Sequence, residues 1–202
     1  MGTAILSAIE SGFLALQAPI HRQKDEHMTS HPLTREYFQS AFVVESLEAA
    51  CHQWSNNFGI GPFFIKDYRP GTFDQVIYRG APADLSMRVA LAQAGTIQIE
   101  LIEPGPGPSA YRDMVPQGSP PTFHHFCAWT DDFAADQHLL ESKGCEAVNI
   151  GHSGPVTFGY FDTRETLGCM LEIVTRLPAV EARFAMIADA ARDWDGTDPI
   201  RE

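Results

Sequence analysis

FVVESLEAA at residues 42–50 is matched by CAWTDDFAA at residues 127–135, and QIELIEP at residues 98–104 by MLEIVTR at residues 170–176. In each pair the two stretches occupy the same place in a run of predicted elements. The first pair joins a strand to a helix, and the second pair forms the last strand of its run. A repeat of this kind indicates a duplicated module, so the fold is predicted from the repeat before any single motif.

Both halves read as β-α-β-β-β. In the first half a helix begins after Ser46 and ends near Gly59, and IGPFFIKDYRP (60–70) is a strand or loop. The strands predicted for this half are YFQSAFVV (37–44), TFDQVIYRG (72–80), LSMRVALAQAG (85–95) and TIQIELIEP (96–104). The second half has a helix in DDFAADQHLLESKG (131–144), and its predicted strands are FHHFCAWT (123–130), CEAVNIG (145–151), TFGYFDT (157–163) and CMLEIVTR (169–176).

These elements divide the chain into five predicted segments. They are an N-terminal helix and linker (1–35), a first βαβββ module (36–104), a Pro/Gly-rich connection (105–121), a second βαβββ module (122–177) and a C-terminal helix (178–202). The fold class that follows is α+β, built from two βαβββ modules with extra helices at both ends.

Composition narrows the classes of partner. The 202 residues carry a formal charge of −12, which disfavours nucleic acid and anionic membranes as partners. No apolar run approaches the roughly 20 residues that cross a bilayer, and the N-terminus has no basic segment typical of a signal peptide. The four cysteines form no CxxC pair, so we expect buried thiols and a cytoplasmic protein.

Each half offers one polar residue early in its first strand and one carboxylate in its last. These residues are Gln39 and Glu100 in the first half, and His125 and Glu172 in the second. Taken singly, each has an ordinary structural explanation. A carboxylate buried in MLEIV, however, must be paired, protonated or bound to a metal. Their matched positions favour one cation shared between the halves.

The motifs FQSAFVVESLEAA, FGIGPF, IQIELIEP, FHHFCAWTDD and GCMLEIV resemble those of the vicinal oxygen chelate superfamily, the glyoxalase/bleomycin-resistance/dioxygenase group. The resemblance covers residues 37–176 and is closest to glyoxalase I-like and methylmalonyl-CoA epimerase-like members. It implies paired βαβββ modules that form a cupped, barrel-like mixed sheet, often as homodimers, with Gln39, Glu100, His125 and Glu172 as ligands of one divalent ion. One imidazole with several oxygen donors suits Zn²⁺, Ni²⁺, Co²⁺ or Mn²⁺.

The reaction that the resemblance implies is proton transfer next to a carbonyl of a small-molecule substrate, through a metal-bound enediolate, by an isomerase, epimerase or lyase. Glu172 is the expected first base, and Glu100 is a ligand and second base. Two alternatives stay open: a metal-free small-molecule binding protein of the same fold, and a ring-cleaving dioxygenase, which uses two histidines. The side chains expected to line the substrate pocket are Phe63, Tyr78, Arg79, Trp129 and Tyr160.

Overall fold

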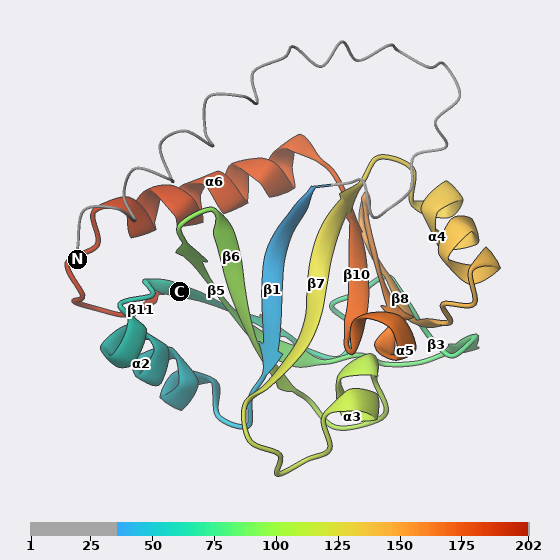
Figure 1. Cartoon of the computed structure of the whole chain (residues 1–202), viewed down its shortest axis with the longest axis horizontal. Coiled ribbons are helices and arrows are strands. Elements are labelled where there is room, and N and C mark those ends of the chain that lie inside the picture. Colours follow the sequence, from blue (N-terminus) through green and yellow to red (C-terminus); the bar gives the residue numbers. More distant parts are fainter. Residues whose placement is uncertain (1–35, 202) are drawn as a thin grey trace, which may run out of the picture.

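The computed structural model describes residues 36–201, so the predicted N-terminal helix lies outside the described residues. The strands in this range form one curved, unclosed, mixed 11-stranded sheet, and the helices lie on its faces and ends (Figure 1). The strands are β1 (Tyr37–Val43), β2 (Phe63–Tyr68), β3 (Gln75–Tyr78), β4 (Ala81–Pro82), β5 (Met87–Ala94), β6 (Ile97–Pro104), β7 (Thr122–Thr130), β8 (Ala147–Ser153), β9 (Val156–Asp162), β10 (Met170–Thr175) and β11 (Ile200–Arg201). The helices are α2 (Leu47–Phe58), α3 (Ala110–Met114), α4 (Phe133–Ser142), α5 (Arg164–Leu167) and α6 (Pro178–Arg192).

The sheet contains the predicted duplication. One half runs β1-β6-β5-β2 and the other runs β7-β10-β9-β8, and the two halves meet where β1 pairs antiparallel with β7. Within each half the first strand is parallel to the last, β1 to β6 and β7 to β10. The predicted pair of modules is therefore confirmed, and the seam between them is a pair of strands in the middle of the sheet.

Two segments of the first half, 63–68 and 75–78, are both strands but pair with different modules. The segment 63–68, read as a strand or loop, is β2 and pairs with β5 inside its own module. The segment around β3 leaves that module instead and pairs with β8, the edge strand of the other module. Residues 69–86 thus form an arm that crosses from one half to the other, because the unpaired edge of β8 offers backbone groups that β3 can satisfy.

The alternation of side chains separates two faces. On β5, Met87, Val89 and Leu91 enter the core on the concave face, and Ala90 and Ala92 pack under α2 on the convex face. The second module repeats this arrangement, with α4 packed on β9 and β10. The concave face is partly covered by α6, whose Ile187 is fully buried.

Local signals place the helix ends near their predicted positions. Helix α2 ends at Gly59, which has a φ of 66°, a conformation that favours glycine. Ser46 makes no side-chain cap. The backbone amide of Leu47 donates instead to Glu103 Oε2 of β6, at 2.7 Å. Helix α4 is capped by Asp132, whose carboxylate accepts from the amide of Ala135. No helix within residues 36–201 is both long and apolar enough to cross a membrane.

Candidate metal centre

Glu100, His125 and Glu172 converge on the concave face at the seam of the two modules. The candidate ligand atoms of these three side chains all lie within 4.8 Å of one another. His125 Nε2 is 3.0 Å from Glu172 Oε2 and 3.4 Å from Glu100 Oε2. The side chain of His125 is fully buried, and those of Glu100 and Glu172 are 13% and 9% exposed. Residues far apart in the sequence therefore form one compact, mostly buried cluster.

Strand register explains how side chains from three strands can meet. Glu100 on β6 and His125 on β7 are both paired with Ala41 of β1, which lies between them. The fully buried Ala41 carries only a methyl group, so the longer side chains on either side can converge above it. Glu172 lies on β10, one strand beyond β7, and is paired with Cys127, two residues along β7 from His125 and on the same face.

The polar atoms of this cluster have the arrangement that a bound cation requires. His125 Nε2 and Glu100 Oε2 are buried, and neither makes a hydrogen bond within the described chain, although both lie within ion-pair distance. Buried polar atoms without partners are costly, and atoms that converge without hydrogen bonding to one another fit ligands of a shared ion. One imidazole and two carboxylates are suitable donors for a first-row divalent metal.

The charges of the cluster are strongly coupled. Burial lowers the pKa of His125, but the nearby Glu100 and Glu172 outweigh this effect and raise it to about 9. Burial also raises the pKa of Glu100, with a contribution in the same direction from Glu172 and an opposing one from His125. In the absence of a metal, a proton on His125 therefore lies between the two carboxylates, in the place that a divalent cation would take.

His124 is held behind His125 by a β-bulge. Across from β7, Ala41 pairs with His125 and Phe42 with Phe123, which leaves His124 as the extra residue. The bulge brings the two rings together, with His124 Nδ1 2.8 Å from His125 Nδ1. Adjacent residues of a regular strand face opposite sides of the sheet, and the bulge breaks this alternation at His124.

The hydrogen bonds of His124 fix the proton positions of both rings. The carbonyl oxygen of Ala110 can only accept, so His124 Nε2, 3.0 Å away, is the donor. Burial, reinforced by His125, lowers the pKa of His124 to about 3, so its ring is neutral and its Nδ1 accepts. His125 Nδ1 is therefore the donor to His124. His125 Nδ1 therefore keeps its proton. When Nε2 loses its own proton, the lone pair of Nε2 is available to a metal.

Glu100 and Glu172 of the cluster line a cavity of about 280 Å³ between the concave face and α6, and His125 lies behind them. Most of the other lining is apolar, and it includes Phe73, Met87, Val89, Leu91, Phe158 and Phe184. Gln39, the fourth predicted ligand, also lines this cavity. Its amide nitrogen donates to Gln98 Oε1 at 2.7 Å, so its oxygen is the group that remains to face a cation.

Tyr160 lines the same cavity, as predicted, and its hydroxyl lies 2.8 Å from that of Tyr111 on α3. The other four residues predicted for the pocket do not line it. Phe63 packs in the convex core under α2, because its neighbour Phe64 takes the concave side of β2. Trp129 is buried behind the cavity, stacked on Phe38 at a centroid separation of 4.1 Å.

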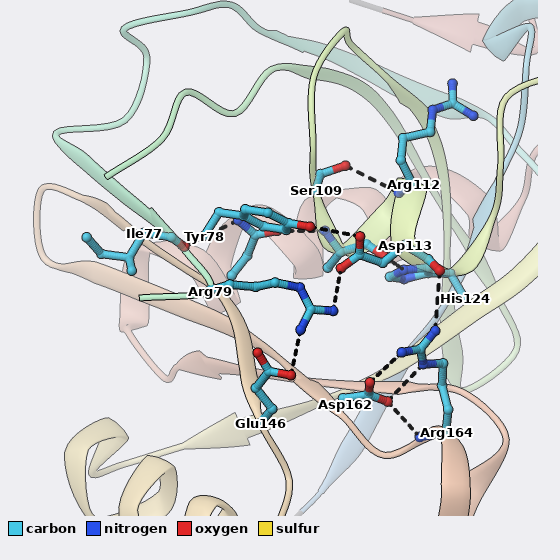
Figure 2. Close-up of polar contacts among 12 residues, drawn as sticks. Ile77, Tyr78, Arg79, Ser109, Arg112, Asp113, His124, Glu146, Asp162 and Arg164 are labelled. Atoms are coloured by element: carbon cyan, nitrogen blue, oxygen red, sulfur yellow. Dashed lines mark hydrogen bonds and ion pairs between the residues drawn. The ribbon is translucent and has the colours of Figure 1, made fainter. Parts of the chain in front are cut away.

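Tyr78 and Arg79 belong to a separate polar network around α3 (Figure 2). The Tyr78 hydroxyl donates to Asp113 Oδ1, and Arg79 bridges Asp113 and Glu146 at 2.9 and 2.6 Å. They lie there because β3 crosses to the second module, which takes both side chains away from the concave centre. Figure 2 also shows His124 beside this network.

The sequence profile of the Glyoxalase/Bleomycin resistance protein/Dioxygenase superfamily matches residues 38–158. The chain belongs to this superfamily. No curated protein sequence matches it significantly.

Two solved structures have a fold similar to that of this chain. Methylmalonyl-CoA epimerase from Mycobacterium tuberculosis superposes with a TM-score of 0.51 at 14% identity, over 77% of this chain and 97% of the epimerase. A hypothetical protein from Bacillus halodurans superposes with a TM-score of 0.53 at 14% identity, over 71% of this chain and 96% of its own. At this identity the two comparisons show a common fold.

The sequence did not predict two features of the site: the histidine behind His125 and the cations of the cavity. His124 gave a signal, because it precedes a predicted ligand, but the bulge that turns it inward is not visible in the sequence. Lys66 and Arg183 also line the cavity and were not selected. For Arg183 a signal existed, since it falls within the apolar stripe of the C-terminal helix.

Proposed function

We propose that this protein is a divalent-metal-dependent isomerase, epimerase or lyase that moves a proton at a carbon next to a carbonyl group. The observation that carries the proposal is the convergence of Glu100, His125 and Glu172 on the wall of an apolar cavity, with buried donor atoms left without partners. We further propose Gln39 Oε1 as the fourth ligand, since Gln39 lines the same cavity.

The two carboxylates are proposed as the groups that handle the proton. Glu100 extends from β6 and Glu172 from β10, on either side of the β1–β7 seam, and both line the cavity. A substrate carbon between them can lose its proton to one carboxylate and regain it from the same or the other one. We assign the first step to Glu172 and the role of ligand and second base to Glu100.

The surroundings strengthen this chemistry. Burial raises the pKa of Glu100, which makes its carboxylate a stronger base than one in water. The apolar side chains of the cavity exclude water from the reacting atoms. A divalent ion held by these ligands would supply positive charge where negative charge develops on the substrate oxygens as the proton leaves.

The Glu172→Gln variant tests the assignment. We expect it to lose at least about 100-fold in turnover, because the amide cannot accept the proton, and to keep most of its bound metal. Solvent deuterium exchange at an acidic C–H of candidate carbonyl compounds, followed by NMR, gives the rate, and elemental analysis gives the metal content. Glu165→Gln, an exposed change on α5, is the matched control. Full exchange activity in Glu172→Gln would refute the role of Glu172.

The two alternatives make different predictions. A metal-free binding protein would keep His125 protonated between Glu100 and Glu172, and protein purified without chelator would contain no stoichiometric metal. A dioxygenase that uses two histidines and a carboxylate would need a second imidazole. His124 does not provide it, because both of its nitrogens are engaged by His125 and Ala110. Oxygen uptake with catechols and Fe²⁺ tests that alternative directly.

A further inference from the structure

Two cationic side chains occupy positions in the cavity where the local pattern calls for apolar ones. On β2, Phe64, Lys66 and Tyr68 share the concave face, and the two aromatic residues pack against the core on either side of Lys66. On α6, the inward stripe consists of Ala179, Val180, Arg183, Phe184 and Ile187, of which the first four line the cavity. Lys66 and Arg183 are therefore directed toward the cavity from opposite walls.

Neither cation has an ion-pair partner in the part of the chain that the structure describes. The chain as a whole has an excess of acidic residues, with a formal charge of −12. The arginines that do pair with carboxylates include Arg79, Arg88, Arg112, Arg164, Arg176 and Arg192. Lys66 Nζ lies over the ring of Tyr68, 4.6 Å from its centroid, and both Lys66 and Arg183 are half-buried.

The two cations are close enough to repel each other. Burial lowers the pKa of Lys66, and the positive charge of Arg183 adds to that effect. Two half-buried like charges without a counterion raise the free energy of the folded protein, and an anion bound between them removes that cost. The carboxylates of the cluster are not that counterion, since Glu100 and Glu172 are in ion-pair contact with His125.

The position of Lys66 separates this pair from the proton-transfer centre. Lys66 is on β2, two strands from Glu100 on β6, and it pairs with Val89, two residues along β5 from Leu91, the partner of Glu100. At the usual strand spacing and rise per residue this is about 12 Å between backbones, and the cavity wall between them is apolar.

We propose that Lys66 and Arg183 form an anion subsite, and that the ligand is a carbonyl compound with an apolar body and a carboxylate or phosphate at its other end. Only the carbonyl group of this ligand rests on the proposed function; the anionic group is inferred from Lys66 and Arg183. The two cations attract the anionic end, and the carbonyl end is left to face the centre formed by Glu100, His125 and Glu172, so the positions of the charges set the direction in which the ligand enters.

Three probes of similar size test the subsite: 4-phenylbutyrate, 3-phenylpropyl phosphate and the neutral 4-phenylbutanamide. Calorimetry with the zinc-loaded protein should show one or both anions binding at least tenfold more tightly than the amide, and the stronger of the two identifies the anionic group. The preference should persist in chelator-treated protein and weaken as salt is added. A preference that disappears on chelation would mean that the anion binds the metal, and would overturn the proposal.

Variants then assign the preference to the two residues. Lys66→Met and Arg183→Met keep the apolar stem, and each should weaken anion binding about tenfold while changing amide binding little. The double variant should bind anion and amide equally. Arg192→Met removes an exposed arginine from the same helix and should behave as wild type. An undiminished preference in the double variant would refute the subsite. None of these measurements requires turnover, so failure of the proposed reaction would be seen separately, in the deuterium-exchange assay.

Discussion

His124 determines which nitrogen of His125 is available at the candidate centre. The chain of hydrogen bonds runs from His125 Nδ1 through the neutral ring of His124 to the carbonyl of Ala110. Partners of this kind hold a metal-binding imidazole in one tautomer and one orientation. His124 is thus a positioning residue, because it acts through His125 and does not line the cavity.

Substitution of His124 tests this role. In His124→Phe the acceptor for His125 Nδ1 is lost, and we expect zinc affinity to fall about 10- to 100-fold. In His124→Asn the side-chain oxygen can still accept from His125, so the loss should be smaller. Competition with a chromophoric chelator measures the affinity. The cobalt-loaded protein should show an altered absorption spectrum in the Phe variant, an effect that a loss of packing alone would not produce. Equal affinities in the two variants would contradict the role.

At the scale of elements, the short helix α3 links the centre to the arm that crosses between the modules. Asn149 on β8 accepts from the backbone amide of Ala110 at 2.7 Å and donates to the carbonyl of Ile77 on β3 at 3.3 Å. The Asn149 side chain is almost fully buried. One amide side chain thus joins α3, β3 and β8, and the carbonyl of the same Ala110 holds His124.

The Asn149→Leu variant should be less stable than wild type by about 3 kcal/mol, because it leaves a backbone donor and a backbone acceptor without their partner. Urea unfolding followed by circular dichroism measures the loss. We also expect weaker zinc binding, since a displaced Ala110 carbonyl no longer orients His124. Asn56→Leu, an exposed change on α2, is the control. Wild-type stability in Asn149→Leu would show that these two hydrogen bonds do not hold the arm.

At the scale of the whole molecule, the candidate centre lies at the β1–β7 seam, one of the places where the two modules meet; the pairing of β3 with β8 is another. The proposed ligands come from both halves, so an ion bound there would stabilise the folded chain against unfolding. The expected homodimer and the cytoplasmic location stay predictions.

The stabilisation by metal should grow with pH. In chelator-treated protein the folded-state pKa of His125 is about 9, above its unfolded value of 6.5. The ion pairs of protonated His125 therefore contribute fully below pH 6.5, and their contribution is lost as the pH rises through 9. In zinc-loaded protein Nε2 carries no proton, so that loss does not occur.

Calorimetric melting temperatures of the loaded and chelated forms, measured from pH 6 to 9.5, should differ by a gap that widens with pH. His138→Gln, an exposed change on α4, should leave the trend unchanged. A gap that stays constant over this range would mean that His125 is not protonated between the two glutamates.

The pattern of the chain was enough to predict the duplicated fold. Apolar alternation and helix ends are local properties, and they repeat in both halves, so the element order from β7 to β10 follows from the sequence. The path of residues 75–82 could not be predicted from the sequence. The pattern of β3 predicts a strand but does not say which strand it pairs with, and the free edge of β8 decides that partner. The aromatic residues Phe63 and Trp129 were assigned to the pocket because composition does not show which face a strand turns to the cavity.

The amino-acid sequence by itself determined the modules and the four residues proposed for the centre, since buried carboxylates at matched places in a repeat are visible without coordinates. Tertiary structure alone decided that three of those side chains meet over the small Ala41, that a bulge turns His124 toward His125, and that Lys66 and Arg183 face one cavity. The physical reason is that spacing along a chain sets the face and period of each element. Distances between strands and helices depend on how the finished sheet curves.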